Sequence, residues 1–393
     1  MISVNESVVF KINKRLTVKI GIYIEVLKAS EKTGIGRYVE GLIKALSNID
    51  TTNEYFLYYQ APLFGEQPAF DIKTGKNFTF RAVKFPNKWF DERPRLWWDH
   101  YLPFIINLDK LDVFHGPNHF IPAKSRCKKI VTIHDIAYFY MNVHGSGMDR
   151  ILENWTRKSL NVADKIITVS NATATDCIKE GAIPDKVDTI YQGFESSYEH
   201  LKLSTELEKQ IVSAMELPEK CILFLGSLQP RKNLPQLLEA FALIANKVPH
   251  CLILAGGKGS SYQQLLSLVE QHNLQKRVIF TGYIDDQQRA ALYQHAELFV
   301  YPSQYEGFGL VVLEAMSFGV PVISTNNSSL PEAVGDAGIL VEIDDSSGLA
   351  EKMLDVLTNE HLKNELIQKG LKHCERFSWQ QSAQEMLTVY QNC

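Results

Sequence analysis

The sequence has few cysteines, and their spacing excludes two kinds of small-domain architecture. The 393 residues include six, Cys127, Cys177, Cys221, Cys251, Cys374 and Cys393, and no two form a C-x-x-C pair. We therefore expect neither a structural zinc site nor a disulfide framework. There is also no H-x-x-x-H, no carboxylate cluster, no G-x-S-x-G and no P-loop motif. These absences exclude the usual metal sites, the α/β-hydrolases and the P-loop NTPases.

Long apolar runs and a basic excess are missing too. No uninterrupted apolar stretch approaches the roughly 18 residues that a membrane span needs, and charges interrupt the start of the chain. We expect no signal peptide and a reducing, cytoplasmic location.

Residues 1–200 hold 26 basic and 23 acidic residues, and residues 201–393 hold 15 and 22. Neither half has the charge of a nucleic-acid binder. The slightly basic first half is compatible with an anionic partner or with chance scatter of surface charge.

Short apolar strands alternate with helix-length amphipathic segments along the chain. In the second half the strand candidates are 221–226, 251–257, 277–282, 297–302, 320–325 and 338–342, and the first half repeats the scheme less regularly. Continuous apolar strands alternating with helices predict parallel sheets covered on both faces. The pattern lapses near residue 200, where we place a domain boundary. The prediction is an α/β protein of two doubly wound domains facing each other across a cleft, with ligands at the carboxyl ends of the strands.

Two glycine-containing loops follow strands of the second half. "GSLQPRKN" places Arg231 and Lys232 just before a helix that begins near Leu234. Cations beside a helix N-terminus favour an anion such as phosphate, although two solvated basic residues are the alternative. "GGKGSS" fails the dinucleotide spacing, so Gly256 and Gly257 either approach a nucleotide base or form a plain turn. Tyr283, just after the strand at 277–282, is a further candidate for nucleotide binding.

The stretch "YEGFGLVVLEAMSFGVPVI" carries two glutamates with seven residues between them. Glu306 lies on a predicted loop, and Glu314 lies about one turn inside a helix that runs from about Leu310 to Gly319. An ionised carboxylate in an apolar helix is costly unless it has a partner. Both carboxylates can accept hydrogen bonds from the hydroxyls of one ligand. The backbone amides between them would face phosphate, and these belong to Gly307, Phe308, Gly309 and Leu310. A sugar nucleotide fits this order; a glutamate that stabilises a neighbouring loop is the alternative.

The first half offers weaker candidates. "EKTGIGRYVEGL" places Gly34 and Gly36 just before a helix, either to admit a substrate close to the backbone or as a simple turn. "VTIHDIAYF" places His134 and Asp135 at the end of a strand, and therefore at the predicted cleft. A lone histidine is more often structural. We rank His115 and His119 below His134.

These motifs together resemble the retaining glycosyltransferases of family 4, which have the GT-B fold. The likeness rests on "TGIGRY", "HD" at His134, "SNAT", "GSLQPRKN" and "EGFGLVVLEAM" followed by "GVPVIST". Residues 1–16 have no counterpart. The resemblance implies an acceptor-binding domain at 1–200, a nucleotide-sugar-binding domain at 201–375 and a final helix at 376–393 that crosses back to the first domain.

The resemblance also implies a role for each candidate. Arg231 and Lys232 would bind the diphosphate and stabilise charge on the leaving nucleotide. Glu306 would hold hydroxyls of the transferred sugar and Glu314 those of the ribose. His134 would contact the sugar near its reacting carbon, and Gly36 would line the phosphate. No metal or cofactor is implied, and the leaving phosphate would take the acceptor proton.

The implied activity is transfer of a hexose, with retention, from a nucleotide-diphosphate sugar to a glycan or lipid-linked saccharide. The "PRKN" motif favours GDP-mannose as the donor and bacterial polysaccharide assembly as the process. A UDP-sugar-dependent transferase is the alternative within the family. Outside it, the alternatives are a non-catalytic sugar-nucleotide-binding protein on the same fold, or an epimerase or phosphorylase of similar architecture.

One further segment, residues 81–98, interleaves basic and aromatic side chains. Basic residues beside interfacial aromatics can bind an anionic membrane surface, which would place the protein peripherally at the inner face of the plasma membrane. The favoured alternative is that the aromatics pack in the core or line the acceptor cleft. The residues concerned are Arg81, Lys84, Lys88, Arg93 and Arg95 with Phe85, Trp89, Phe90, Trp97 and Trp98.

Overall fold

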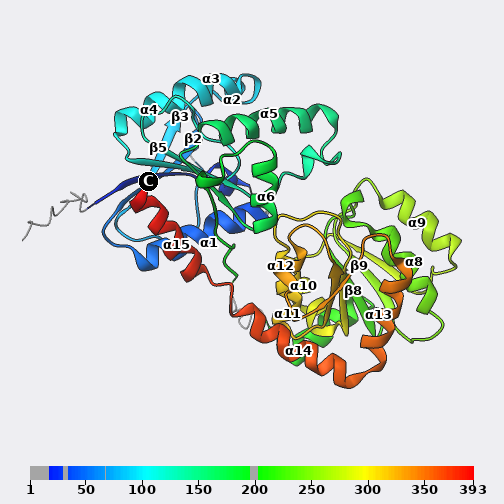
Figure 1. The fold of residues 1–393 in the computed structure, drawn as a ribbon. Helices are drawn as coiled ribbons and strands as arrows, with labels where there is room; N and C mark the ends of the chain where they lie inside the picture. Colours follow the sequence, from blue (N-terminus) through cyan, green and yellow to red (C-terminus); the bar gives the residue numbers. More distant parts are fainter. Residues whose placement is uncertain (1–16, 30–33, 67, 195–201) are drawn as a thin grey trace, which may run out of the picture.

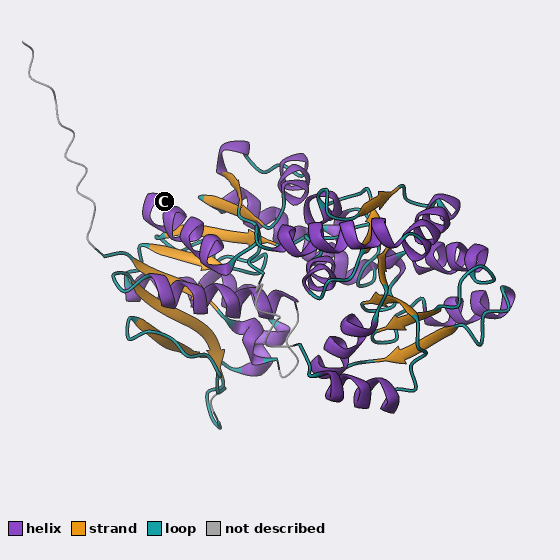
Figure 2. Cartoon of the chain, turned by 90° about the horizontal axis from the view of Figure 1, so that it is seen from below, coloured by secondary structure: helices purple, strands orange, loops and turns teal. Residues whose placement is uncertain are grey.

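The computed structural model describes residues 17–29, 34–66, 68–194 and 202–393, which form two domains, each built around one sheet (Figure 1). The first 16 residues and the predicted boundary at residues 200 and 201 lie outside this part of the chain. We call each sheet with its covering helices the first and the second domain. Figure 2 shows the strands of each sheet grouped in their own half of the molecule.

The first domain holds a 7-stranded sheet whose paired strands are all parallel. In spatial order its strands are β3 (Phe78–Lys84), β2 (Glu54–Ala61), β1 (Lys19–Tyr23), β4 (Val113–Gly116), β5 (Lys128–Ile133), β6 (Lys165–Thr168) and β7 (Val187–Thr189). Its helices are α1 (Gly34–Ile49), α2 (Asn87–Glu92), α3 (Pro94–Leu96), α4 (Leu102–Asp109), α5 (Ser146–Val162) and α6 (Asn171–Lys179). The sheet order reverses at β1 and β4, as in a doubly wound fold.

Alternation along β2 explains why helices cover both faces of this sheet. Tyr55, Leu57 and Tyr59 are buried in one apolar cluster with α1. Tyr58 points to the other face, where it is buried with Trp97 of a π-helical turn at Trp97–Tyr101. Successive side chains of a strand point to opposite faces, so a strand with apolar residues at every position needs a cover on each side.

The second domain holds a 6-stranded parallel sheet. Its strands, in spatial order, are β10 (Val278–Gly282), β9 (Cys251–Ala255), β8 (Cys221–Leu225), β11 (Leu298–Tyr301), β12 (Val322–Thr325) and β13 (Ile339–Val341). Its helices are α7 (Thr205–Ala214), α8 (Leu234–Ile244), α9 (Tyr262–Gln271), α10 (Asp286–His295), α11 (Leu310–Ser317), α12 (Leu330–Val334), α13 (Ser346–Thr358) and α14 (Glu360–Cys374). The predicted fold class, two doubly wound Rossmann-like domains, is confirmed.

The last helix, α15 (Trp379–Asn392), returns to the first domain and packs against α1 (Figure 1). Trp379 fits against two glycines: a Cβ on Gly41 would lie 2.3 Å from its ring, and one on Gly193 would lie 2.4 Å from it. Farther along, the Tyr390 hydroxyl lies 2.7 Å from Nδ1 of buried His115. The final helix is therefore part of the first domain's core.

The structure also corrects or refines three expectations. Gly34 and Gly36 do not precede the first helix, because α1 begins at Gly34; the first turn of a helix tolerates glycine, since its N–H groups have no partner within the helix. β7 was not predicted, because its three residues are only half-buried. In the basic and aromatic segment, Phe85, Trp97 and Trp98 are buried in the core, which confirms the packing alternative for these three.

Among the residues that the structure describes, no helix combines the length and the apolar character needed to span a membrane.

Candidate active site

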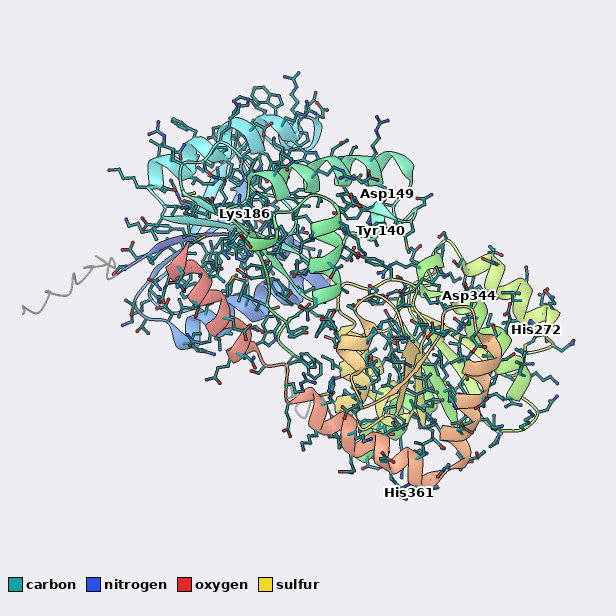
Figure 3. All side chains as sticks on the ribbon, in the orientation of Figure 1. Tyr140, Asp149, Lys186, His272, Asp344 and His361 are labelled. Carbon is teal, nitrogen blue, oxygen red and sulfur yellow. The ribbon has the colours of Figure 1, made fainter. Side chains whose placement is uncertain are left out.

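Arg231 and Lys232 lie where β8 ends and α8 begins. They belong to a single 3-10 turn, Pro230–Lys232, and Asn233 follows in the left-handed region with φ 51°. Asn233 is held there because its side-chain amide donates to Gln236 and to Asp344, which is labelled in Figure 3. The tight turn directs Lys232 into the domain, where only 4% of it is exposed. The predicted position of both cations at a strand end is confirmed.

Glu306 is the partner of both cations. Its Oε1 lies 3.0 Å from Arg231 Nη1, and Lys232 Nζ donates to the same oxygen. Tyr301 and Ser303 donate to it as well, at 3.0 and 2.6 Å. Burial raises the pKa of Glu306, but the charges of Lys232 and Arg231 outweigh burial and lower that pKa to about 2. Glu306 is therefore an ionised carboxylate inside the protein.

Lys232 responds differently to the same neighbours. Burial lowers the pKa of Lys232 to about 8, against the raising effect of Glu306, and the charge of Arg231 acts in the same direction as burial. Glu306 contacts two cations, whereas Lys232 and Arg231 both contact the same carboxylate, that of Glu306. Two cations contact one carboxylate, and Asp135 of the first domain adds a further negative charge nearby that acts on both cations. An anionic ligand beside the two cations would be stabilised by them.

Glu314 lies inside α11 and is 4% exposed. Tyr293 donates to its Oε2 at 3.0 Å, and its Oε1 lies 3.6 Å from Arg289 and 3.7 Å from Arg37. Arg37 belongs to α1 and reaches across from the first domain, where it also pairs with Asp286 at 3.2 Å. The carboxylate is thus surrounded by charge rather than by the apolar helix that the sequence indicated. Sequence reasoning missed both arginines, although Arg37 stands within "TGIGRY".

The segment from Gly307 to Leu310 joins Glu306 to α11. A Cβ on Gly307 would lie 2.0 Å from the carbonyl oxygen of His134, so only glycine allows the two domains to approach here. Gly309 precedes α11 with φ 105°, again a glycine conformation. The Phe308 side chain is buried beside Tyr191 and Phe377, and Leu310 is half-buried. The loop is fixed by close packing on both sides.

His134 follows β5 and is buried. Its Nε2 lies 2.8 Å from the Pro117 carbonyl oxygen, and its ring meets the edge of Tyr38 at 4.7 Å. Because a carbonyl only accepts, Nε2 carries the hydrogen and Nδ1 is the acceptor. Burial lowers the pKa of His134, although Pro117 and Asp135 oppose it. His134 is therefore a neutral side chain with one acceptor nitrogen.

The remaining candidates come from three other positions in the fold. Gly36 is buried in the first turn of α1. Gly256 follows β9, and a Cβ there would meet the Gly226 carbonyl oxygen at 2.0 Å, whereas one on Gly257 would meet no atom of the described part of the chain within 4 Å. Tyr283 follows the edge strand β10 and is 70% exposed. Two strands, β9 and β8, lie between β10 and β11, the strand that precedes Glu306.

The cluster lies where the two domains meet. The Tyr305 hydroxyl donates to Asp176 of α6 at 2.7 Å. Tyr140, labelled in Figure 3 on the side of the first domain that faces the second, has its ring 6.0 Å from the Tyr305 ring. Strand ends of both sheets thus supply the candidate residues: β5 supplies His134, β8 supplies Arg231 and Lys232, and β11 supplies Glu306.

Comparisons with known families match both halves of the chain. Residues 32–198 match the model described as Glycosyltransferase Family 4, and residues 206–373 match the model described as Glycosyl transferases group 1. A curated relative, the O-antigen chain mannosyltransferase B of Escherichia coli, is 30% identical over 367 residues, which cover 91% of this chain and 96% of the relative.

Solved structures agree on the fold. Sucrose-phosphate synthase from Thermosynechococcus elongatus superposes with a TM-score of 0.73 at 22% identity, covering 95% of this chain and 98% of that one. Anabaena HepE, solved in complex with UDP-glucose, superposes with a TM-score of 0.70 at 18% identity, covering 95% of this chain and 100% of that one. From its sequence relatives and its fold together, the chain belongs to the glycosyltransferases of family 4 and is an enzyme with the GT-B fold.

Proposed function

We propose that this glycosyltransferase moves mannose from GDP-mannose, with retention of configuration, to a glycan or a lipid-linked saccharide. The observation that carries the proposal is the largely buried cluster in which Arg231 and Lys232 both contact the Glu306 carboxylate. A nucleoside diphosphate is an anion that two such cations would bind together. The choice of mannose is supported by the relative named as an O-antigen chain mannosyltransferase and by the "PRKN" motif.

The geometry supports a role for each part of the donor. All four contacts that the described residues make to the Glu306 carboxylate are to Oε1, so we assign Oε2 to hydroxyls of the transferred sugar. Nδ1 of His134 accepts a hydrogen bond from another sugar hydroxyl. The backbone amides from Gly307 to Leu310, at the start of α11, bind the diphosphate with the cations. Glu314 accepts from the ribose hydroxyls.

The reaction then needs little proton chemistry from the protein. The bond between the sugar's anomeric carbon and the diphosphate oxygen breaks, and a bond from that carbon to the acceptor oxygen forms on the same face. The acceptor proton passes to the departing diphosphate, which leaves as GDP. Charge on the leaving oxygen grows toward the transition state, so Lys232 and Arg231 stabilise the transition state more than the bound donor.

Binding distinguishes the donors before any acceptor is known. A nucleotide that binds only the folded state stabilises it by RT ln(1 + [L]/Kd), so at equal concentration the nucleotide with the higher affinity raises the melting temperature more. We expect GDP to raise it more than UDP or ADP at equal concentration. A larger shift with UDP would instead favour the UDP-sugar alternative.

Transfer is tested with GDP-mannose and a panel of saccharide acceptors, and the anomeric configuration of the product is read by NMR. An α-linked product from the α-linked donor supports retention, and a β-linked product contradicts it. The same assay with EDTA tests the expectation that no metal is required. Strong inhibition that Mg²⁺ restores would overturn that part of the proposal.

A further inference from the structure

Glu332 of α12, in the second domain, contacts the first domain through both of its carboxylate oxygens. Oε2 accepts from the backbone N–H of Asn171 at 2.8 Å, and Oε1 accepts from that of Ala172 at 2.8 Å. The Tyr191 hydroxyl, also in the first domain, donates to Oε2 at 2.9 Å. One carboxylate thus makes three hydrogen bonds across the domain boundary.

These bonds complete the N-terminus of α6. The first N–H groups of a helix have no partner within it, and a negative charge is favourable beside them. Ser170 satisfies Thr173, because its hydroxyl accepts from the Thr173 N–H at 3.1 Å. Asn171 and Ala172 precede Thr173 in the helix, and their N–H groups donate to Glu332 instead. The first domain therefore relies on a residue of the second to complete this helix end.

Residues next to the Glu332 contact form hydrogen bonds with active-site residues in both domains. On the second domain, Ser328 and Ser329, just before α12, donate to the Glu306 carbonyl at 2.6 and 2.8 Å. On the first domain, the Thr173 hydroxyl lies 3.4 Å from the His134 carbonyl oxygen and 3.3 Å from that of Gly307. Short hydrogen-bonded paths thus lead from Glu332 to Glu306 and to His134.

We infer that Glu332 is a positioning residue that sets the Glu306–Gly307 loop against His134 by joining α12 to the N-terminus of α6. The inference rests on the proposed function for its kinetic consequence, since transfer needs the sugar held by both domains at once. A misplacement of about 1 Å between reacting groups can cost on the order of a hundredfold in rate. A carboxylate suits this role because it can accept from two adjacent N–H groups.

Two variants remove the contact from opposite domains. Glu332→Gln keeps the side-chain volume but presents an amide NH₂ to one of the two N–H donors. Asn171→Pro removes one donor instead, and proline is well tolerated at the first position of a helix. The residue before it, Ser170, has φ −155° and ψ 158°, a conformation that suits a following proline. Glu351→Gln is the matched control, because Glu351 is exposed on α13 and, among the described residues, forms an ion pair with Lys352 alone.

We expect each variant to have a kcat at least about tenfold lower than wild type when assayed well below the variant's melting temperature. The dissociation constant of the nucleotide should change little. The double variant should be about as slow as either single one, because both break one contact. Small-angle X-ray scattering of the free proteins should show a larger radius of gyration for both variants than for wild type and Glu351→Gln.

A kcat within about twofold of wild type in both variants would overturn the inference, even if their melting temperatures fall, because it would leave Glu332 a purely stabilising contact. Additive losses in the double variant would also overturn it. If wild type transfers no hexose from any donor, the proposed function fails, and the scattering comparison still decides whether Glu332 joins the domains.

Discussion

Lys232 is the buried cation whose protonation the proposed transfer depends on most. Burial lowers its pKa to about 8, so the ammonium is lost as pH rises through that value. Only the charged form stabilises the leaving diphosphate. We therefore expect kcat/KM to fall by about tenfold per pH unit above about pH 8. Lys232→Arg, which stays charged, should move this fall to higher pH, and an identical profile for the two proteins would contradict the assignment.

Glu314 is the residue whose role the structure changes most. In an apolar helix Glu314→Ala would leave the fold intact, but here the change would remove the buried carboxylate that lies 3.6 Å from Arg289, whose side chain is 12% exposed and whose other carboxylate partner, Asp286, lies at the surface. Glu314→Gln keeps the volume and an acceptor for Tyr293. Hydrogen bonds to a charged group are worth about 1.5 to 3 kcal/mol, so we expect nucleotide binding, measured by calorimetry, to weaken roughly tenfold or more.

Glu351→Gln serves as the control for Glu314→Gln as well. Unchanged nucleotide affinity together with a lower melting temperature would favour the alternative that Glu314 only stabilises neighbouring loops.

The sequence was sufficient for those site residues that lie beside a strand end. His134 follows β5 directly, and the other three, Arg231, Lys232 and Glu306, lie in the segments just after β8 and β11. Parallel strands end at one edge of a sheet. Arg289 could not be found in this way. It lies inside α10 in "DQQRAALYQH", an ordinary helical segment, and it matters because α10 packs beside α11. Glu332 is another case, since its partners are about 160 residues away along the chain.

At the scale of single elements, the fit of α15 on α1 depends on the absence of a side chain at Gly41. A Cβ there would lie 2.3 Å from the Trp379 ring, closer than packing allows. We expect Gly41→Ala to cost about 1 to 3 kcal/mol of unfolding free energy, the usual cost of overpacking, as measured by urea denaturation. Gly34→Ala is the control on the same helix, because a Cβ there meets no atom of the described residues within 4 Å. Equal stabilities for the two variants would contradict this account.

Elements with a strong local pattern were predictable, and those that depend on their surroundings were not. The predicted strands at 221–226 and 251–257 form as β8 and β9, because continuous apolar residues fit a sheet covered on both faces. β7 has only three residues and follows a 3-10 turn, so its pairing with β6 decides its conformation. α1 begins at Gly34, a few residues before the predicted start of this helix, and helix ends are often misplaced by such amounts.

At the scale of the whole molecule, only part of the segment 81–98 is exposed and able to contact a membrane. Lys84, Lys88, Arg93 and Arg95 are exposed, and of the predicted aromatics Trp89 is exposed by 46%. Phe104 and Leu108, one turn apart on α4, add exposed apolar side chains. We propose that this surface binds anionic membranes by charge and by interfacial insertion.

We expect co-sedimentation with phosphatidylserine vesicles at low salt, little at high salt and little with neutral vesicles, because a Debye length of about 10 Å at 0.1 M salt shortens further as salt rises. Lys88→Glu with Arg93→Glu should abolish pelleting, and Lys352→Glu, in the second domain, is the control. Absence of pelleting in every condition would leave the surface to an acceptor or to solvent.

The position of α15 has a consequence for how the protein is made. A ribosome completes β1 to β7 long before it reaches Trp379, and at 5 to 20 residues per second the delay is on the order of 10 to 40 s. Throughout that time the surface that Met386, Leu387 and Tyr390 will cover has no α15 on it. The domain that is translated first is thus finished last, and its apolar surface for α15 stays uncovered until the second domain has been made.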